Sequence, residues 1–210
     1  MSCTLDRVRV KICGITNEKD ALAAVAAGAD AVGFIFYERS PRFVQPDRVR
    51  QIVSALPPFV ATVGVFVNEA ADRINETIRV CGLSAAQLHG DESPEYCTTI
   101  TGVCIKAFRV QDASWREVAA KYPVQAVLLD TYAPDKYGGT GRTFDWNLVS
   151  GSPLPVILSG GLNPENVAEA IRQACPYAVD TSSGVEREPG RKDHDRVRAF
   201  VEAVKQSTAR

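Results

Sequence analysis

Residues 157–166 read ILSGGLNPEN, and residues 179–186 read VDTSSGVE. In both stretches an apolar run, typical of a buried strand, ends in a turn of small residues that leads towards a helix. The N–H groups of such turns are unobstructed and lie near the positive end of a helix dipole, so two neighbouring turns can hold one phosphate group. A single turn of this kind also serves simply to reverse the chain, because glycine does so at little steric cost. The succession of two such turns favours a phosphate site.

Short apolar runs alternate with amphipathic segments along the whole chain, in eight pairs. The expected strands are residues 8–13, 31–36, 61–67, 85–89, 103–108, 126–130, 155–159 and 178–181. This alternation fits both a closed (β/α)8 barrel and an open doubly wound sheet. In the open sheet the phosphate turn normally follows the first strand, where this chain has CGITN at residues 13–17 rather than G-x-G-x-x-G. Phosphate turns after the last two strands are typical of barrels, so the sequence predicts an α/β fold, a single (β/α)8 TIM barrel.

Polar residues and glycine mark where several helices begin and end. Asn17 is the expected N-cap of the first helix, and Gly28 is expected to end it. Asn163 is expected to cap the helix after the seventh strand, with Pro164 in its first position. Asp193 is the expected cap of the last helix.

Length and composition restrict the kinds of protein that this chain can be. Its 210 residues suit one domain, residues 1–210, in which residues 1–6 form a short N-terminal extension. A net charge of -1 without a basic run argues against a nucleic-acid or membrane partner. The first residues lack the apolar core of a signal peptide or membrane span, so we expect a cytoplasmic protein. The six cysteines form no C-x-x-C pair, and neither a disulfide framework nor a metal site is expected.

In a barrel of this type, chemistry takes place at the carboxyl ends of the strands. The expected strands place there Cys13, Arg39, Arg42, His89 and Asp130, together with the two phosphate turns. This set offers a candidate base, a candidate acid, a cation for a carboxylate and a cradle for a phosphate. Such a combination suits an isomerase that acts on a phosphorylated substrate.

Several of these residues belong to longer motifs. The motifs are KICGIT at residues 11–16, GADAVGF at 28–34, SPR at 40–42, VGVFV at 63–67, QLHG at 87–90, LD at 129–130, GGTG at 138–141 and TFDW at 143–146. Together with the two phosphate turns they resemble the phosphoribosylanthranilate isomerase family of tryptophan biosynthesis, in order from about Arg7 to Val204. The main departures are the N-terminal extension and Asp135-Lys136 in the loop before the glycines, and neither touches an expected catalytic position.

The resemblance implies a cofactor-free Amadori rearrangement of N-(5-phosphoribosyl)anthranilate to 1-(2-carboxyphenylamino)-1-deoxyribulose 5-phosphate. This chemistry needs an acid that protonates the furanose oxygen and a base that removes the proton from C2. Asp130 is the expected acid, because it follows an apolar run where desolvation helps a carboxyl group to keep its proton. Cys13 is the expected base, and nearby positive charge or backbone N–H groups must favour its thiolate. Lys11 is not expected to contribute, because it lies a full pleat deeper along the strand.

Each of these two residues also has a structural interpretation. Asp130 could cap a helix or a loop, and Cys13 could be a packing thiol. Their positions at the mouth of one barrel, inside the motifs of one family, favour the catalytic roles.

The other groups of the substrate also have candidate partners. Arg42 is expected to bind the anthranilate carboxylate through two parallel hydrogen bonds, with Arg39 as the nearby alternative. His89 is expected either to orient the substrate or to be a structural histidine, and Asp180 to bind ribose hydroxyls or orient the phosphate turns. Gly139 is expected to belong to a flap over the site or to a tight loop. The expected phosphate-binding residues are Ser159, Gly160, Gly161, Ser182, Ser183 and Gly184.

Two other functions stay open on the sequence alone. A phosphoribosyl isomerase of histidine biosynthesis or an indole-glycerol-phosphate synthase would share the phosphate turns, but the first should have Asp in place of Cys13 and the second a pair of catalytic lysines. A phosphosugar-binding regulatory module would need neither Cys13 nor Asp130. The expected partner is a small-molecule phosphosugar, bound by a monomer or a homodimer.

Overall fold

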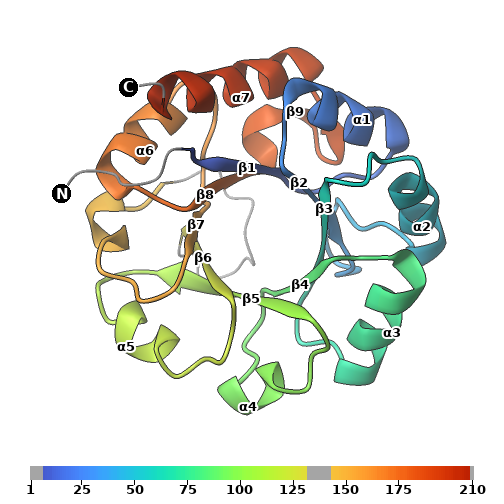
Figure 1. Ribbon diagram of the computed structural model, residues 1–210, viewed down its shortest axis with the longest axis horizontal. Helices are drawn as coiled ribbons and strands as arrows, with labels where there is room; N and C mark the ends of the chain where they lie inside the picture. Colours follow the sequence, from blue (N-terminus) through green and yellow to red (C-terminus); the bar gives the residue numbers. More distant parts are fainter. Residues whose placement is uncertain (1–6, 132–142, 209–210) are drawn as a thin grey trace.

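Eight parallel strands form a closed barrel in the computed structural model, which describes residues 7–131 and 143–208. The strands follow one another around the ring in chain order, and β1 pairs with β8 (Figure 1). Their bounds are β1 (Arg9–Ile12), β2 (Ala31–Ile35), β3 (Ala61–Phe66), β4 (Ala85–Leu88), β5 (Val103–Val110), β6 (Ala126–Thr131), β7 (Val156–Leu158) and β8 (Ala178–Thr181). The closed barrel predicted from the phosphate turns is confirmed, and the open sheet is excluded.

Helices surround the barrel and cover the outer face of its strands (Figure 1). They are α1 (Glu18–Ala27), α2 (Pro46–Ser54), α3 (Ala71–Cys81), α4 (Pro94–Cys97), α5 (Trp115–Ala119), α6 (Val167–Ala174) and α7 (His194–Thr208). Between β6 and β7 the described residues, 143–155, form a 3-10 turn, η1 (Trp146–Val149), in place of the regular helix expected after each strand. Gly151, Pro153 and Pro155 interrupt the segment after η1, because glycine is flexible and proline lacks the N–H that a helix needs. Among the described residues, no helix is long and apolar enough to span a bilayer.

The capping residues agree with the sequence at three of four positions. The Asn17 side chain accepts a hydrogen bond from the Asp20 N–H at the start of α1, and Gly28 ends that helix with φ of 106°. The Asp193 carboxylate accepts from the N–H groups of the first turn of α7. The prediction that Asn163 starts the seventh helix directly is wrong: its side chain caps a turn, and α6 begins only at Val167.

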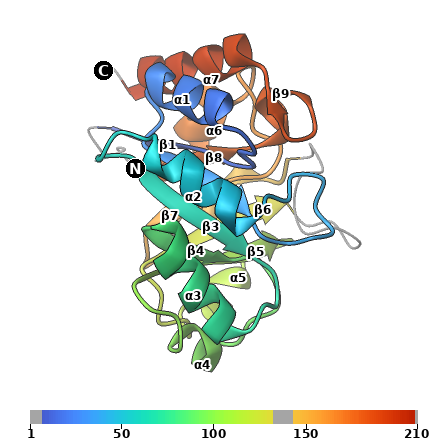
Figure 2. The same ribbon diagram turned by 90° about the vertical axis from the view of Figure 1, so that its right-hand side faces the viewer.

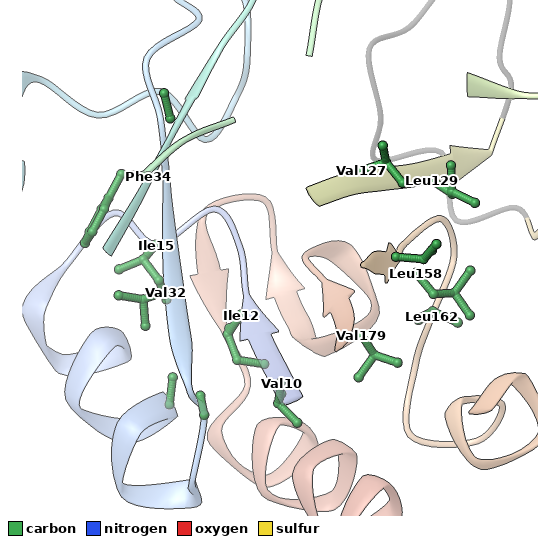
Figure 3. Packing of buried hydrophobic residues seen from close by; sticks show 14 of the residues in the cluster. Val10, Ile12, Ile15, Val32, Phe34, Val127, Leu129, Leu158, Leu162 and Val179 are labelled. Atoms are coloured by element: carbon green, nitrogen blue, oxygen red, sulfur yellow. The ribbon is translucent and has the colours of Figure 1, made fainter. Parts of the chain in front are cut away.

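Side chains alternate between the two faces of each strand, as the two-residue period of a strand requires. The outward-facing residues, among them Val10, Ile12, Val127, Leu158 and Val179, pack under the helices in one large cluster (Figure 3). The inward-facing residues at the lower end of the barrel form a second, smaller cluster of Val63, Ala85, Ile105, Ala107, Ala126, Leu128, Ile157 and Ala178. Nearer the carboxyl ends of the strands, the inward-facing positions become polar and form the floor of the site.

A turn, η2 (Ser183–Val185), and a small hairpin, β9 (Glu186–Glu188) with β10 (Arg191–Lys192), follow β8. The sequence pattern did not predict this hairpin, because its strands are too short to show a period. It lies at the same end of the barrel as the tip of β6 (Figure 2). The buried Asp20 of α1 anchors it by accepting hydrogen bonds from the Lys192 N–H, at 2.9 Å, and from His194 Nε2, at 2.7 Å.

We expect Asp20 to stabilise the fold in a pH-dependent way. Burial raises the pKa of its carboxyl group, but hydrogen bonds from Lys192, His194 and Asn17 outweigh burial and lower that pKa below 3.8. The stabilisation is therefore complete above the unfolded pKa of about 3.9 and is lost as the pH falls through the lower folded value. Asp20→Asn should reduce the free energy of unfolding by about 2 kcal/mol at pH 7. Urea unfolding of the wild type and the variant at several pH values measures the difference in their free energies of unfolding. If that difference stays constant down to the most acidic pH, the prediction is contradicted.

Candidate active site

A cavity of about 590 Å³ opens at the carboxyl ends of the strands, within the usual size range of ligand sites. Most of the predicted site residues line it: Cys13, Arg42, His89, Asp130, Ser159, Gly160, Gly161, Asp180, Ser182 and Ser183. Arg39, the alternative to Arg42, lines it too. Gly184 is absent from this wall, and Gly139 lies outside the residues that the structure describes. The predicted acid, base and phosphate turns are thus brought to one place.

Cys13 follows β1 and faces into the barrel. Its N–H donates to the Thr181 carbonyl at 2.8 Å, and its side chain packs over Gly33 of β2, where a Cβ atom would lie 2.8 Å from the sulfur. Burial raises the pKa of the thiol above its ordinary value, and the Asp180 carboxylate raises it further. The positive charges of Lys11 and Lys192 lower it. The effect of burial on the pKa of the thiol thus outweighs the effect of the two cations.

Lys11 contacts Cys13, contrary to the expectation that its deeper position on β1 excludes it. Its ammonium group acts on the thiol through its charge and a hydrogen bond, and it forms an ion pair with Asp180 at 2.8 Å. Burial lowers the pKa of Lys11, but the charges of Asp180 and Cys13 raise it to about 12, so the side chain stays positively charged. The long methylene chain spans the pleat that separates the two residues, a reach that an argument from Cβ positions overlooks.

Asp130 lies near the end of β6 and is 4 % exposed, so it has the desolvated position expected of it. One carboxylate oxygen accepts from the Thr131 N–H at 2.8 Å, and the other lies 3.3 Å from His89 Nε2. Gln87 of β4 lies one pleat below His89, with its amide nitrogen 2.9 Å from Nδ1. With Gln87 as the donor to Nδ1, the neutral ring carries its proton on Nε2, facing Asp130. His89 Nε2 thus lies beside the Asp130 carboxylate without forming a hydrogen bond to a described residue in this geometry.

The two phosphate turns lie side by side after β7 and β8. Gly160 and Gly161 have φ of 85° and 67°, which glycine adopts without strain, and a Cβ atom at Gly160 would lie 3.0 Å from the Asp130 carboxylate. In the described parts of the chain, the N–H groups of Gly160, Gly161 and Ser183 donate to no backbone acceptor. They are therefore available to an anion.

Asp180 and Gly184 support these turns from below. The Ser159 hydroxyl donates to Asp180 at 3.1 Å, which joins the first turn to the Lys11–Asp180 ion pair. A Cβ atom at Gly184 would lie 1.9 Å from the Leu162 carbonyl oxygen, so Gly184 lets the two turns touch. Of the two roles expected for Asp180, the structure shows the contact with a phosphate turn.

Arg42 reaches the cavity wall from the loop after β2 and forms a two-point ion pair with Glu186 of the hairpin. Its Nε lies 2.9 Å and its Nη2 2.7 Å from the carboxylate oxygens. Burial raises the pKa of Glu186, but hydrogen bonds and charge from Arg42 and Lys192 lower it below the usual value, so Glu186 is ionised. In Lys192, burial lowers the pKa of the ammonium group, and Glu186 opposes that effect. The Nη1 group of Arg42 donates to none of the described residues, so this edge of the guanidinium remains for a ligand.

Sequence reasoning missed three polar residues of this region. Gln87 lies within an expected apolar strand, Glu186 lies in a motif that assigns it no role, and Lys192 belongs to no motif. A polar residue at an inward position of a buried strand is the signal that could have revealed Gln87. Among the described residues, no cluster of three or more His, Cys, Asp or Glu side chains could hold a metal ion.

The family model described as N-(5'phosphoribosyl)anthranilate (PRA) isomerase matches residues 10–203. The chain belongs to the phosphoribosylanthranilate isomerase family. The isomerase of that name from Trichlorobacter lovleyi is 51% identical over 203 residues, which cover 95% of this chain and 99% of the relative.

Solved structures of phosphoribosylanthranilate isomerases have the same fold. Monomers generated from the dimeric isomerase of Thermotoga maritima superpose with a TM-score of 0.85 at 45% identity, over 95% of this chain and 99% of that one. A phosphoribosylanthranilate isomerase in complex with reduced 1-(o-carboxyphenylamino)-1-deoxyribulose 5-phosphate gives a TM-score of 0.81 at 45% identity, with the same coverage. That complex shows that a barrel of this family binds the reduced form of the rearranged phosphosugar.

Proposed function

We propose that this protein catalyses the Amadori rearrangement of N-(5-phosphoribosyl)anthranilate to 1-(2-carboxyphenylamino)-1-deoxyribulose 5-phosphate in tryptophan biosynthesis. The observation that carries the proposal is that Cys13 and Asp130 line the same cavity as two phosphate turns and the Arg42 guanidinium. The rearrangement is an internal redox isomerisation in which only protons are exchanged with the enzyme. An acid and a base therefore suffice for it.

Asp130 is the proposed acid for ring opening. It gives its proton to the furanose ring oxygen as the bond from C1 to that oxygen breaks, while the lone pair of the anthranilate nitrogen forms a C=N bond to C1. The position of His89 Nε2, 3.3 Å from the Asp130 carboxylate, supports this role, because the ring can hold the carboxylate after the proton has left. The Thr131 N–H, bonded to the other oxygen, supports the same orientation.

Cys13 is the proposed base for the second step. Its thiolate removes the proton from C2, the C2–H electrons form the C1–C2 double bond, and the electrons of the C=N bond return to nitrogen. The resulting enol amine becomes the 2-keto product when a proton leaves the C2 hydroxyl and another reaches C1. Lys11 supports the thiolate through its charge and hydrogen bond, and Lys192 through its charge.

The two ends of the substrate are proposed to bind to neighbouring parts of the cavity wall, because a Cβ atom at Gly14 would lie 2.7 Å from Arg42 Cδ and 2.8 Å from Ser182 Oγ. The phosphate accepts from the N–H groups of Gly160, Gly161 and Ser183, with Ser159 and Ser182 beside them; Gly184 keeps the two turns in contact. The anthranilate carboxylate binds the edge of Arg42 that Glu186 leaves open. Asp180 fixes Ser159, and the expected flap residue Gly139 lies outside the described residues.

Arg42→Ala should impair the enzyme far more than Arg39→Ala. Removal of Arg42 takes away the partner of the substrate carboxylate and leaves the buried Glu186 with Lys192 as its one cation among the described residues, so kcat/KM should fall by about 30- to 1,000-fold. Arg39 is exposed in the turn after β2, so its removal should cost less than about fivefold in kcat/KM. Steady-state kinetics of both variants decide; the reverse order would assign the carboxylate to Arg39.

Turnover of N-(5-phosphoribosyl)anthranilate, followed by the loss of anthranilate fluorescence, tests the proposed function. The same protein is offered the histidine-pathway aminoaldose phosphate and the rearranged product itself. Turnover of the anthranilate substrate alone supports the proposal. Conversion of the product to an indole would identify a synthase, and binding without any turnover would identify a regulatory module.

We propose a cytoplasmic enzyme that works as a monomer or a homodimer. The dimeric state of the Thermotoga maritima relative favours a dimer here, and sedimentation equilibrium measures the mass directly.

A further inference from the structure

Lys192 of β10 is a buried cation that no step of the proposed mechanism uses directly. Its side chain is 0 % exposed and lies behind the cavity wall rather than in it. The ammonium group donates to the Ser182 carbonyl at 3.1 Å and to Glu186 Oε1 at 2.8 Å. Burial of a charged group is costly unless it is well paired, so these two contacts need an explanation.

The contact with Ser182 fixes a peptide of the second phosphate turn. None of the described residues has a cis peptide bond, and in a trans peptide the C=O and N–H groups point in opposite directions. Because the Ser182 carbonyl faces Lys192, the N–H of Ser183 in the same peptide points away from it. Ser182 and Ser183 both line the cavity, so this N–H is directed towards the ligand side. The ammonium group also polarises the peptide and makes that N–H a better donor.

The contact with Glu186 acts on the opposite end of the ligand. Glu186 Oε1 is shared between Lys192 Nζ, at 2.8 Å, and Arg42 Nε, at 2.9 Å. Arg42 and Glu186 alone would be electrically neutral, whereas the three side chains carry a net charge of +1 when Lys192 is protonated, as its ion pair with Glu186 requires. Lys192 thus prevents Glu186 from cancelling the positive charge that Arg42 presents to a carboxylate.

We propose that Lys192 is a positioning residue that prepares two anion subsites of one cavity, the phosphate subsite through the Ser182–Ser183 peptide and the carboxylate subsite through Glu186 and Arg42. The assignment of the two subsites rests on the proposed function. The subsites themselves can be tested with fragments, without turnover.

Calorimetric titration with inorganic phosphate alone and with benzoate alone measures the two subsites separately. Lys192→Met should weaken the binding of phosphate and of benzoate by at least about tenfold each, since it removes a charge-assisted contact to both subsites. Arg191→Gln is the matched control: it removes the same charge from the neighbouring position of β10, but Arg191 is exposed and, among the described residues, pairs only with Glu188. Both fragments should bind this control within about twofold of the wild type.

The double variant Lys192→Met/Glu186→Gln removes both buried charges and keeps the test valid if the single variant does not fold. Phosphate binding should stay weak in it, because the Ser182 carbonyl still lacks its donor. Benzoate binding should recover, because no carboxylate then neutralises Arg42. If Lys192 had only a structural role, the affinities for phosphate and for benzoate would change together in both variants.

Two results would overturn the proposal. The first is that Lys192→Met and the double variant both bind phosphate as tightly as the wild type. The second is that Arg191→Gln loses as much affinity for the fragments as Lys192→Met. A wild type that binds both fragments but does not turn over the phosphoribosyl substrate would instead refute the proposed function and leave the role of Lys192 standing.

Discussion

Replacing Cys13 with serine is expected to lower kcat by about 10⁴-fold, the upper end of what a general base contributes. A serine hydroxyl has nearly the same size as the thiol, but it is far less acidic and ionises too rarely to take the proton from C2. The protein should keep its fold, because Cys13 is held through its backbone N–H, which bonds the Thr181 carbonyl. Steady-state turnover with the anthranilate substrate measures the effect.

Cys81→Ser is the matched control for this variant. Cys81 is also buried and has a raised thiol pKa, but it lies at the end of α3 and donates to the Pro46 carbonyl, away from the cavity. Its replacement should leave kcat within about twofold. A Cys13→Ser enzyme with nearly wild-type kcat would refute the assignment of the base.

The pH profile of the wild type reports the same thiol. Burial raises the pKa of Cys13 above 9.0, so most molecules carry a neutral thiol at pH 7. Once the thiol has fully ionised, a further rise in pH removes protonated acid without adding base, so kcat/KM should fall only above about pH 9. Cys13→Ser should lack this alkaline limb.

Asp130→Asn is expected to lower kcat by at least about 10²-fold. The amide keeps the size of the side chain and can still accept from the Thr131 N–H, but it cannot give a proton to the ring oxygen. The loss should appear in kcat rather than in KM, because the phosphate and carboxylate subsites are untouched. Asp112→Asn, at an exposed loop position, removes the same charge and should leave kcat unchanged.

A result in which Asp130→Asn raises only KM would assign the residue to substrate binding. A second measurement is more informative. Asp130→Asn is given a substrate analogue with a better leaving group at the ring oxygen, and its kcat should then recover. Such a rescue would show directly that protonation of the leaving oxygen is what the carboxyl group supplies.

The fold was predictable because the signals that decide it are local. The SGG and SSG turns mark the ends of two adjacent strands, and β-branched runs mark most of the others. The region between β6 and β7 was not predictable in the same way, because the helix expected there competes with Gly151 and two prolines. The short hairpin after β8 has too few residues for any period to show.

The sequence was sufficient to predict those residues of the site that lie at the carboxyl ends of the strands. Cys13, His89 and Asp130 follow directly from the rule that parallel strands present their carboxyl ends on one face. Lys11 was missed because its reach depends on a side-chain conformation, which sequence position does not encode. Lys192 was missed because it belongs to the hairpin after β8, which shows no sequence period, and its contacts with Ser182 and Glu186 depend on how that hairpin folds back.

Gly184 has a consequence for how such a protein can diverge. A side chain at this position would meet the carbonyl of Leu162, to which the Thr181 hydroxyl also donates at 2.7 Å, so the two phosphate turns fit only as a matched pair. A mutation in one turn would be tolerated only together with a compensating change in the backbone of the other turn. Two such changes rarely arise in one mutational step. The wall around Arg42, built from side chains, can vary one residue at a time. Descendants of this barrel should therefore acquire new substrates that differ in the group opposite the phosphate, while the phosphate itself is inherited.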